Sequence, residues 1–148
     1  MPMPKSVVKI RNGNVEYTSN VDRAEYTLLE LSRAALKDTG RFVCSVFRKS
    51  YYSAFRKKSG RAGKGCQYWV RKKECDLQVG LGKKAIGFYS GMQELGTSKS
   101  KRYGLLRKAV DSNIGKIREI QSKYLSAMDN ELLASAYIDE KEEVGDDG

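Results

Sequence analysis

The chain has 148 residues, enough for one domain with a buried core, and carries a net charge of +10. Apolar residues make up 40% and charged residues 31%, a balance that favours exposed helices or an extended shape over a compact sphere. The absence of histidine and the three cysteines without a CxxC spacing argue against a zinc site and favour buried free thiols in a reducing compartment.

The first twenty residues are expected to form an arm or a hairpin. Pro2 and Pro4 favour an extended start. Two short β-type segments, residues 7–10 and 15–18, flank the Asn-Gly turn signal at 13, which is typical of a hairpin. An ordered tail is the alternative. No apolar run approaches the length of a membrane span, so we expect a soluble protein made in the cytoplasm, with no membrane contact.

A long amphipathic helix is predicted over residues 21–57. Ser19-Asn20 or Asp22 can cap its start, and Glu25 lies three residues after Asp22, the spacing of a capping box. An apolar stripe then continues for about eight turns at helical spacing. Gly40 lies within the stripe and is expected to bend or split the helix. The stripe comprises Leu28, Leu29, Leu31, Ala35, Leu36, Phe42, Val43, Val46, Phe47, Tyr51 and Ala54.

Basic residues follow the first half of this helix. Between positions 41 and 73 there are eleven lysines and arginines and no acidic residue. One interpretation is a solvated helix face; the other is a surface that meets phosphates or an acidic protein. The predicted loop at 58–65 is glycine-rich, but it precedes a strand and follows a helix, so it does not fit a P-loop. The candidate contacts are Arg41, Arg48, Lys49, Arg56, Lys57, Lys58, Arg61 and Lys64.

A small antiparallel sheet is predicted over residues 66–97. Its first two strands are 66–73 and 76–80, and residues 85–94 form the third. Alternation places Trp69 on the face opposite Tyr68. An exposed tryptophan can stack on a nucleic-acid base, but it more often anchors a core or a subunit interface.

A loop at 98–104 and a second long helix at 105–138 complete the predicted domain, which spans residues 1–138. The apolar stripe of this helix is interrupted near Gly115 or at Asp129-Asn130. Residues 139–148 hold six acidic residues and one lysine, and we expect a mobile tail. Without this tail the net charge is +15. The fold class is α+β, with two long amphipathic helices packed on the sheet.

The turn between the sheet and the second helix is expected to be the joint of the fold. Glu94 can accept N–H groups of the loop or pair with Arg107. Gly96 is expected to adopt a positive φ or to allow a close backbone approach, and the Thr97 hydroxyl can cap a turn. Glu94 has no second carboxylate or histidine beside it in the motif, so acid–base catalysis is not expected.

The segments Phe88-Tyr89, Glu94-Leu-Gly-Thr97 and Tyr103-Gly-Leu-Leu-Arg-Lys-Ala109 resemble the tail-completion (neck) proteins of long-tailed bacteriophages. That family combines an aromatic strand, a Glu-x-Gly-Thr turn and a Pro-Phe-Leu-Arg-Pro-Ala entry into its last helix. Gly104 and Lys108 stand where the family has prolines, and Leu105 replaces its phenylalanine. The matching positions are Glu94, Gly96, Thr97, Leu106, Arg107 and Ala109.

The resemblance implies a structural subunit of the virion neck, without catalysis, metal or cofactor. Such a subunit forms a ring with itself, expected to be hexameric, between head-closure proteins and the tail terminator or tail tube. DNA passes through this ring, so non-specific phosphate contacts are expected. Trp69, Phe88 and Tyr89 are the candidate interface anchors. The alternative is a free, sequence-nonspecific nucleic-acid-binding protein that uses Tyr68, Trp69 and Tyr103 for stacking.

Overall fold

The computed structural model describes residues 7–12, 15–55, 61–82 and 85–143. Over these residues the protein is α+β, with five α-helices, two separate two-stranded antiparallel sheets and two short 3-10 helices. In chain order the elements are β1 (Val7–Asn12), β2 (Val15–Ser19), α1 (Val21–Ala54), η1 (Arg61–Gly65), β3 (Cys66–Arg71), β4 (Asp76–Leu81), α2 (Ala85–Leu95), α3 (Leu105–Asp111), α4 (Ile114–Ser126), η2 (Ala127–Asp129) and α5 (Glu131–Glu143).

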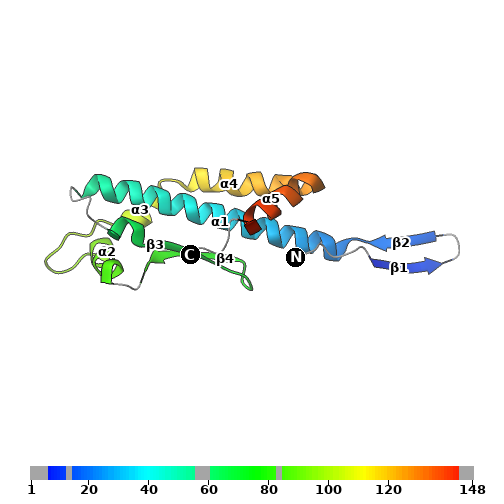
Figure 1. The fold of residues 1–148 in the computed structure, drawn as a ribbon, viewed down its shortest axis with the longest axis horizontal. Helices are drawn as coiled ribbons and strands as arrows, with labels where there is room; N and C mark the ends of the chain where they lie inside the picture. The colour runs from blue at the N-terminus through cyan, green and yellow to red at the C-terminus, as the bar shows by residue number, and fades with distance from the viewer. Residues whose placement is uncertain (1–6, 13–14, 56–60, 83–84, 144–148) are drawn as a thin grey trace.

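Helix α1 is the central element of the fold. Its 34 residues make a rod about 50 Å long that runs through the middle of the molecule (Figure 1). Within the predicted apolar stripe, five residues are buried: Leu31, Ala35, Val43, Phe47 and Tyr51. Leu36, Phe42 and Val46 are half-buried, and Leu28, Leu29 and Ala54 are exposed. The helix ends at Ala54, where Phe55 adopts an extended conformation. The last predicted helical residues, 56 and 57, lie outside the described residues.

Gly40 does not split the helix, contrary to one of the two expectations. The helix is continuous through Gly40, and the glycine lies against β3. A Cβ atom at position 40 would be 2.6 Å from the ring of Tyr68. No side chain fits in that space. The sequence pattern suggested that Gly40 interrupts the helix, whereas in the structure Gly40 provides the space for a packing contact.

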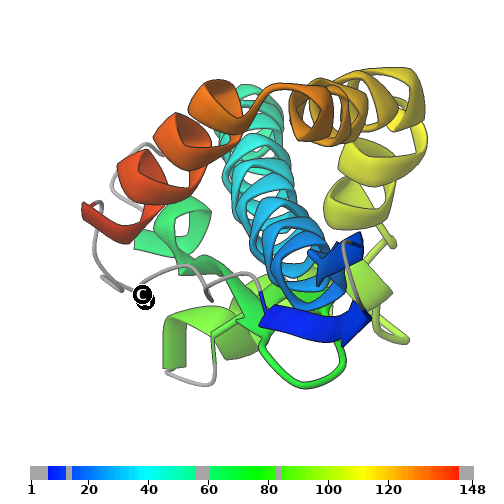
Figure 2. The same cartoon turned by 90° about the vertical axis from the view of Figure 1, so that its right-hand side faces the viewer.

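The core consists of two clusters, one on each half of α1. Near its N-terminal half, Leu31, Ala34 and Ala35 pack against Tyr124 of α4 and against α5. Near its C-terminal half, buried residues of α1 pack against Cys66 of β3 and Ala109 of α3. The α1 residues of this cluster are Val43, Cys44, Phe47 and Tyr51. Figure 2, a view along α1, shows the other helices and the strands arranged around it.

The β3–β4 hairpin confirms the first two predicted strands and their short turn. Trp69 pairs with Gln78 and Val70 with Leu77 across the hairpin. Cys75 in the turn has a φ of 49°, the left-handed conformation that a tight turn requires. Cys66 and Trp69 lie on opposite faces of β3, as the alternation predicts; Cys66 is on the buried face and Trp69 on the exposed one.

The third predicted strand is wrong: residues 85–95 form helix α2. Its aromatic and isoleucine residues have high β-propensity, but side-chain packing overrides propensity in such short segments. Ser90 is buried, while Tyr89, Met92 and Leu95 are exposed at intervals of three, which is helical and not strand spacing. The sheet therefore has two strands, and α2 lies beside its open end (Figure 1).

The predicted second long helix is three helices instead of one. The first break is at Ser112-Asn113, where the Asn113 amide donates to the carbonyl of Ala109. The second break lies around Asn130, so the helix is interrupted at both places that the sequence indicated, near Gly115 and at Asp129-Asn130. The Asn130 carboxamide accepts from the N–H groups of Leu132 and Leu133 and caps α5. Helix α3 and Ile117 at the start of α4 pack with the sheet-side cluster, whereas the rest of α4 and α5 cover the other half of α1.

The two ends of the chain differ from the prediction in detail. β1 and β2 form the expected antiparallel hairpin, which extends beyond the start of α1 (Figure 1). Helix α5 reaches Glu143, so half of the predicted mobile tail is helical backbone; residues 144–148 lie outside the described part. The whole chain exposes 10951 Å², compared with about 7,600 Å² expected for a compact monomer of 16.6 kDa.

Candidate functional site

A joint connects the end of α2 to the start of α3, and we define it as residues 93–107. The Glu94 carboxylate accepts the backbone N–H groups of Leu106 at 2.9 Å and Arg107 at 3.0 Å. These are two of the N–H groups that a helix leaves unpaired at its N-terminus. Glu94 therefore caps α3 from another helix. It was expected to accept N–H groups of the loop or to pair with Arg107; the N–H groups that it accepts belong to the first turn of α3 instead.

Glycine is required at two positions of this joint. Gly96 has a φ of 79°, and a Cβ there would lie 3.0 Å from the backbone nitrogen of Arg102. Both expected properties of Gly96, a positive φ and a close backbone approach, are confirmed. Gly104 has a φ of 59° and immediately precedes α3. It stands where the resembling family has proline, so this chain enters the helix by a left-handed residue instead.

The loop between the two glycines is held by its own backbone. Thr97 and Ser100 exchange backbone hydrogen bonds of 3.0 and 3.2 Å, and the Tyr103 N–H donates to the carbonyl of Gln93 at 2.9 Å. These bonds close the loop on the end of α2. The backbone of Thr97, and not its hydroxyl, makes the contacts that the structure describes.

Aromatic packing fixes the joint to α1. The ring of Tyr103 lies 4.9 Å from that of Phe55, and Phe55 lies 4.7 Å from Tyr51. The Tyr51 hydroxyl donates to the Gln93 carboxamide at 2.8 Å. The end of α2, the loop and the end of α1 thus form one connected unit. Sequence reasoning missed Tyr51 and Gln93, because no local spacing indicates a contact across 42 positions.

The six residues of the resembling motif have distinct positions in this unit. Glu94, Leu106 and Arg107 meet at the helix cap, and Gly96 shapes the loop. Ala109 is buried in the core cluster with α1, and Thr97 is exposed. Among the described contacts, the Glu94 carboxylate bonds to the backbone N–H groups of the cap, and no second carboxylate bonds to it. The arrangement orients α3 and has no feature of an acid–base site.

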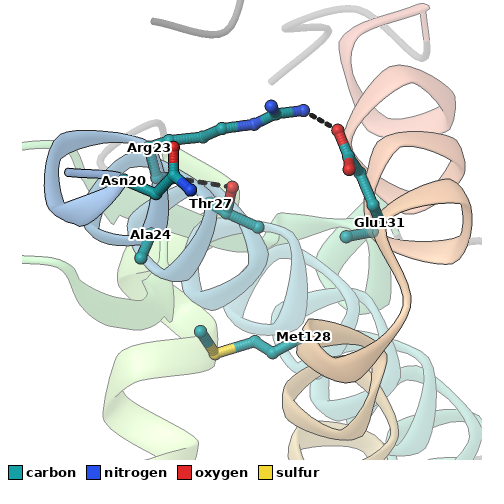
Figure 3. Close-up of a pocket in the computed structure, with 7 residues that line it drawn as sticks. Asn20, Arg23, Ala24, Thr27, Met128 and Glu131 are labelled. Carbon is teal, nitrogen blue, oxygen red and sulfur yellow. Dashed lines mark hydrogen bonds and ion pairs between the residues drawn. The ribbon is translucent and has the colours of Figure 1, made fainter. Parts of the chain in front are cut away.

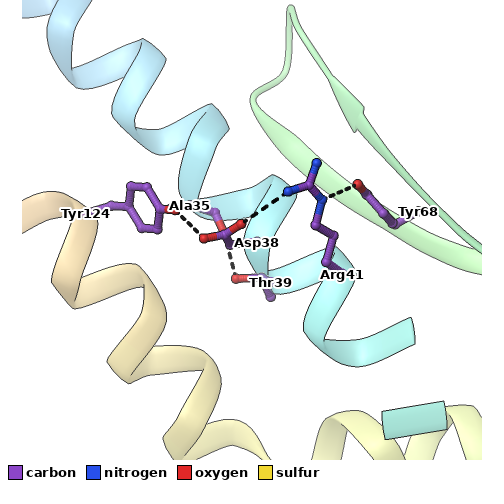
Figure 4. A network of polar contacts seen from close by, with 6 residues as sticks. All are labelled: Ala35, Asp38, Thr39, Arg41, Tyr68 and Tyr124. Carbon is purple, nitrogen blue, oxygen red and sulfur yellow. Dashed lines mark hydrogen bonds and ion pairs between the residues drawn. The ribbon is translucent and has the colours of Figure 1, made fainter. Parts of the chain in front are cut away.

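Arg41 differs from the other basic candidates because it is used inside the fold. Its Nε donates to the Tyr68 hydroxyl at 3.1 Å, and its guanidinium lies 4.0 Å from the Asp38 carboxylate. Asp38 also accepts from the Tyr124 hydroxyl. Figure 4 shows this network joining α4, α1 and β3. The sequence placed Arg41 on the solvent face, but in the structure it is half-buried against the hairpin.

The remaining basic candidates have three different outcomes. Arg48, Lys49 and Lys64 are exposed and available to an anionic partner. Arg61 begins η1, but its side chain lies outside the described part of the protein. Three candidates at the end of the predicted helix lie outside the described residues altogether: Arg56, Lys57 and Lys58.

Two of the three candidate interface anchors are on the surface. Trp69 is 68% exposed on the outer face of β3, and Tyr89 is 67% exposed on α2. Trp69 is therefore not a core residue, and both the interface and the stacking interpretations remain. The side chain of Phe88 lies outside the described part of the protein.

A shallow pocket of about 240 Å³ lies between the start of α1 and the η2–α5 region (Figure 3). Arg23 and Glu131 form an ion pair across it, and the Thr27 hydroxyl donates to the backbone of Arg23. Its lining contains no thiol, histidine or pair of carboxylates, and it contains none of the predicted site residues. The lining residues are Asn20, Arg23, Ala24, Thr27, Met128, Glu131 and Ala134.

The described residues contain no group of three or more metal-ligating side chains. Within the same residues, none of the helices is long and apolar enough to cross a bilayer. Comparison with protein-family models, with curated proteins and with solved structures finds no match for the chain.

Proposed function

We propose that the chain is a structural subunit of a bacteriophage virion neck, a tail-completion protein that joins head-closure proteins to the tail terminator or tail tube. One observation carries the proposal: the motif that resembles this family folds into a single joint. Glu94 caps α3 through Leu106 and Arg107, with Gly96 forming the close turn between them. The turn has a geometric role, as expected of a part that sets the direction of a helix in an assembly.

The shape of the chain supports a role in assembly. Its accessible surface exceeds that of a compact monomer of equal mass by several thousand Å². A stable interface buries roughly 1,200–2,000 Å² in total, so this surface leaves room for more than one neighbour. Trp69 and Tyr89 are exposed aromatic residues of the type that dominates interface energies. The proposed neighbours are other copies in a ring, expected to be hexameric, and the adjacent neck proteins.

Basic residues near the C-terminal end of α1, where the joint also packs, support contact with the DNA that passes through a neck. Arg48 and Lys49 are exposed near the end of α1, and Lys64 is exposed in η1, which follows it along the chain. Such contacts would be to phosphates and independent of sequence. No catalytic step is proposed, because the joint lacks an acid–base pair.

The decisive experiment interrupts the gene for this chain in its phage genome and examines lysates by electron microscopy. We expect filled heads and separate tails, with infectious particles restored when the intact chain is supplied in trans. Supplying Glu94→Ala is expected to restore fewer joined particles, because α3 loses its cap. The matched control is Glu119→Ala, which removes an exposed carboxylate bonded to Lys116 on α4 and is expected to restore joining fully.

Two results would contradict the proposal. One is joined, infectious particles in the absence of the chain. The other is an image of the intact virion in which the neck contains no density for α1 and its surrounding helices. Equal restoration by Glu94→Ala and Glu119→Ala, at equal protein levels, would reject the joint as the functional element while leaving the neck assignment to the first two tests.

A free nucleic-acid-binding protein is the second candidate, and the +15 charge of residues 1–138 favours it. Affinity of the purified monomer for DNA of arbitrary sequence, measured between about 50 and 200 mM salt, distinguishes the two. A steep loss of affinity with salt, weakened by Lys49→Gln, supports free DNA binding. Negligible binding by the monomer excludes it.

A further inference from the structure

Two of the three cysteines meet in the core, although they are 22 positions apart in the chain. Cys44 lies on α1 and Cys66 at the start of β3, and their Sγ atoms are 3.0 Å apart. Each is only 6% exposed. A disulfide bond measures about 2.05 Å, so the two sulfur atoms need to approach by about 1 Å. Sequence reasoning found no pairing because the spacing has no known signature.

We propose that Cys44 and Cys66 are a thiol pair that a peroxide or a small-molecule disulfide oxidises to an intramolecular disulfide, which then links α1 covalently to β3. The inference is independent of the proposed neck function. It concerns a modification site inside the fold, and its test does not use phage particles.

The surroundings of the pair shift the pKa of each thiol. The two sulfur atoms share a hydrogen bond in which either can be the donor, and this bond lowers the pKa of Cys44 in spite of its burial. The charge of Arg48, one turn along α1 from Cys44, favours the thiolate form of both cysteines. The same hydrogen bond, together with burial, raises the pKa of Cys66. Attack by the Cys44 thiolate with resolution by Cys66, or the same steps with the two roles exchanged, gives the same disulfide.

With hydrogen peroxide the reaction balances in two steps. The Cys44 thiolate attacks one peroxide oxygen, the O–O bond breaks, and the released hydroxide takes a proton to become water; Cys44 is now a sulfenic acid. Cys66 sulfur then attacks the Cys44 sulfur, the S–O bond breaks, and the hydroxide leaves as a second water with the Cys66 proton. Overall, two thiols lose two electrons and one peroxide gains them.

Cys75 is the internal control, because it lies in the β3–β4 turn and has no place in the pair. The purified protein is treated with hydrogen peroxide, or with oxidised glutathione in a second arm, then denatured and alkylated. We expect free thiols to fall from three to one, the mass to fall by two hydrogens, and a digest to contain a peptide linking Cys44 to Cys66. The Cys75→Ser variant is expected to go from two thiols to none.

The oxidised protein is expected to melt about 5 °C higher or more, because the link restricts the unfolded chain, and dithiothreitol should reverse the shift. Cys44→Ala should form no intramolecular link and show no such shift. Retention of three free thiols, or a digest in which the link joins Cys75 to another cysteine, would overturn the proposal. The peptide map of the unmutated protein decides this even if Cys44→Ala fails to fold.

Discussion

Gly40 is the residue at which a single added atom should matter most. Its Cα faces the ring of Tyr68, which Arg41 holds through its hydroxyl. We predict that Gly40→Ala lowers the free energy of unfolding by about 1–3 kcal/mol, because the methyl group would overpack this contact. Urea denaturation followed by circular dichroism measures the change.

The control for this substitution is Gly115→Ala in α4, where a Cβ would meet nothing within 4 Å. It should be neutral or stabilise the protein by up to about 1 kcal/mol, since alanine is the better helix former. A Gly40→Ala protein as stable as Gly115→Ala would show that β3 does not pack against α1 at this point.

Glu94 gives the second residue-level prediction. Truncation in Glu94→Ala removes both acceptors of the α3 cap, and we expect a loss of about 1–2 kcal/mol in the free energy of unfolding. Glu119→Ala, which breaks an exposed ion pair with Lys116, should cost less than about 0.5 kcal/mol. Equal losses for the two variants, measured by chemical denaturation, would contradict the capping role.

The ion pair between Arg71 and Asp76 closes the β3–β4 hairpin and gives a prediction about pH. Hydrogen bonds from Arg71 lower the pKa of Asp76. A carboxylate with a lowered pKa stabilises the fold above its unfolded value, near 3.9, and this contribution is lost as the pH falls through the folded value. Wild type should therefore be more stable than Asp76→Asn at pH 7, and the difference should shrink below about pH 4.

The measurement is the urea midpoint of both proteins at pH 7, 5 and 3. Asp129→Asn, at an exposed carboxylate in η2, controls for the general effect of removing one negative charge. A difference between wild type and Asp76→Asn that stays constant across this range, or grows toward low pH, would contradict the assignment.

At the scale of elements, α2 is the segment whose type most needs a test. Gly91 lies within it, and a Cβ there would meet nothing within 4 Å. We predict that Gly91→Ala stabilises the protein by about 0.5–1 kcal/mol and slightly increases the helical circular dichroism signal. In a strand the alanine would bring no comparable gain, since alanine is depleted in strands. A loss of stability would argue for the extended conformation.

The elements that periodicity defines over many turns could be predicted, and the short ones could not. Helix α1 was predictable because its stripe repeats for eight turns, and β3–β4 because two alternating segments flank a short turn. Residues 85–95 were misread because two glycines and several β-type side chains obscured a helical spacing of three. The break near Gly115 was one of the two interruptions that the sequence indicated, but its position at Ser112-Asn113 involves a side-chain hydrogen bond to Ala109 that no pattern predicts.

The candidate site was predictable only where a role is local. The positive φ of Gly96 could be predicted from its place in a turn, and the hydrogen-bonding role of Glu94 from its place beside that turn. The contacts across the fold were not predictable: Tyr51 with Gln93, Arg41 with Tyr68, and Cys44 with Cys66 each join segments that only the tertiary structure brings together. From the sequence, Tyr51 was assigned to the apolar stripe, Arg41 to a solvent-facing basic surface, and the two cysteines to separate free thiols.

At the scale of the whole molecule, one helix serves two cores. The cluster with α4 and α5 and the cluster with β3 and α3 share α1 but no buried residue among those described. The Asp38 network lies between them and joins Tyr124 on one side to Tyr68, through Arg41, on the other. The fold is one long helix, α1, with a separate packing cluster on each half, and this elongated arrangement explains why a chain of this size exposes so much surface.

The exposed position of Trp69 has a practical consequence, because it is the single tryptophan of the chain. An indole in water emits at the red end of its range, so the intrinsic fluorescence of the monomer should resemble that of the unfolded protein. Covering the outer face of β3 would shift the emission to the blue. We predict that titration with the proposed neck partners produces this shift if they cover that face, whereas an unchanged spectrum upon complex formation would place the interface elsewhere. The protein thus contains its own optical reporter of assembly.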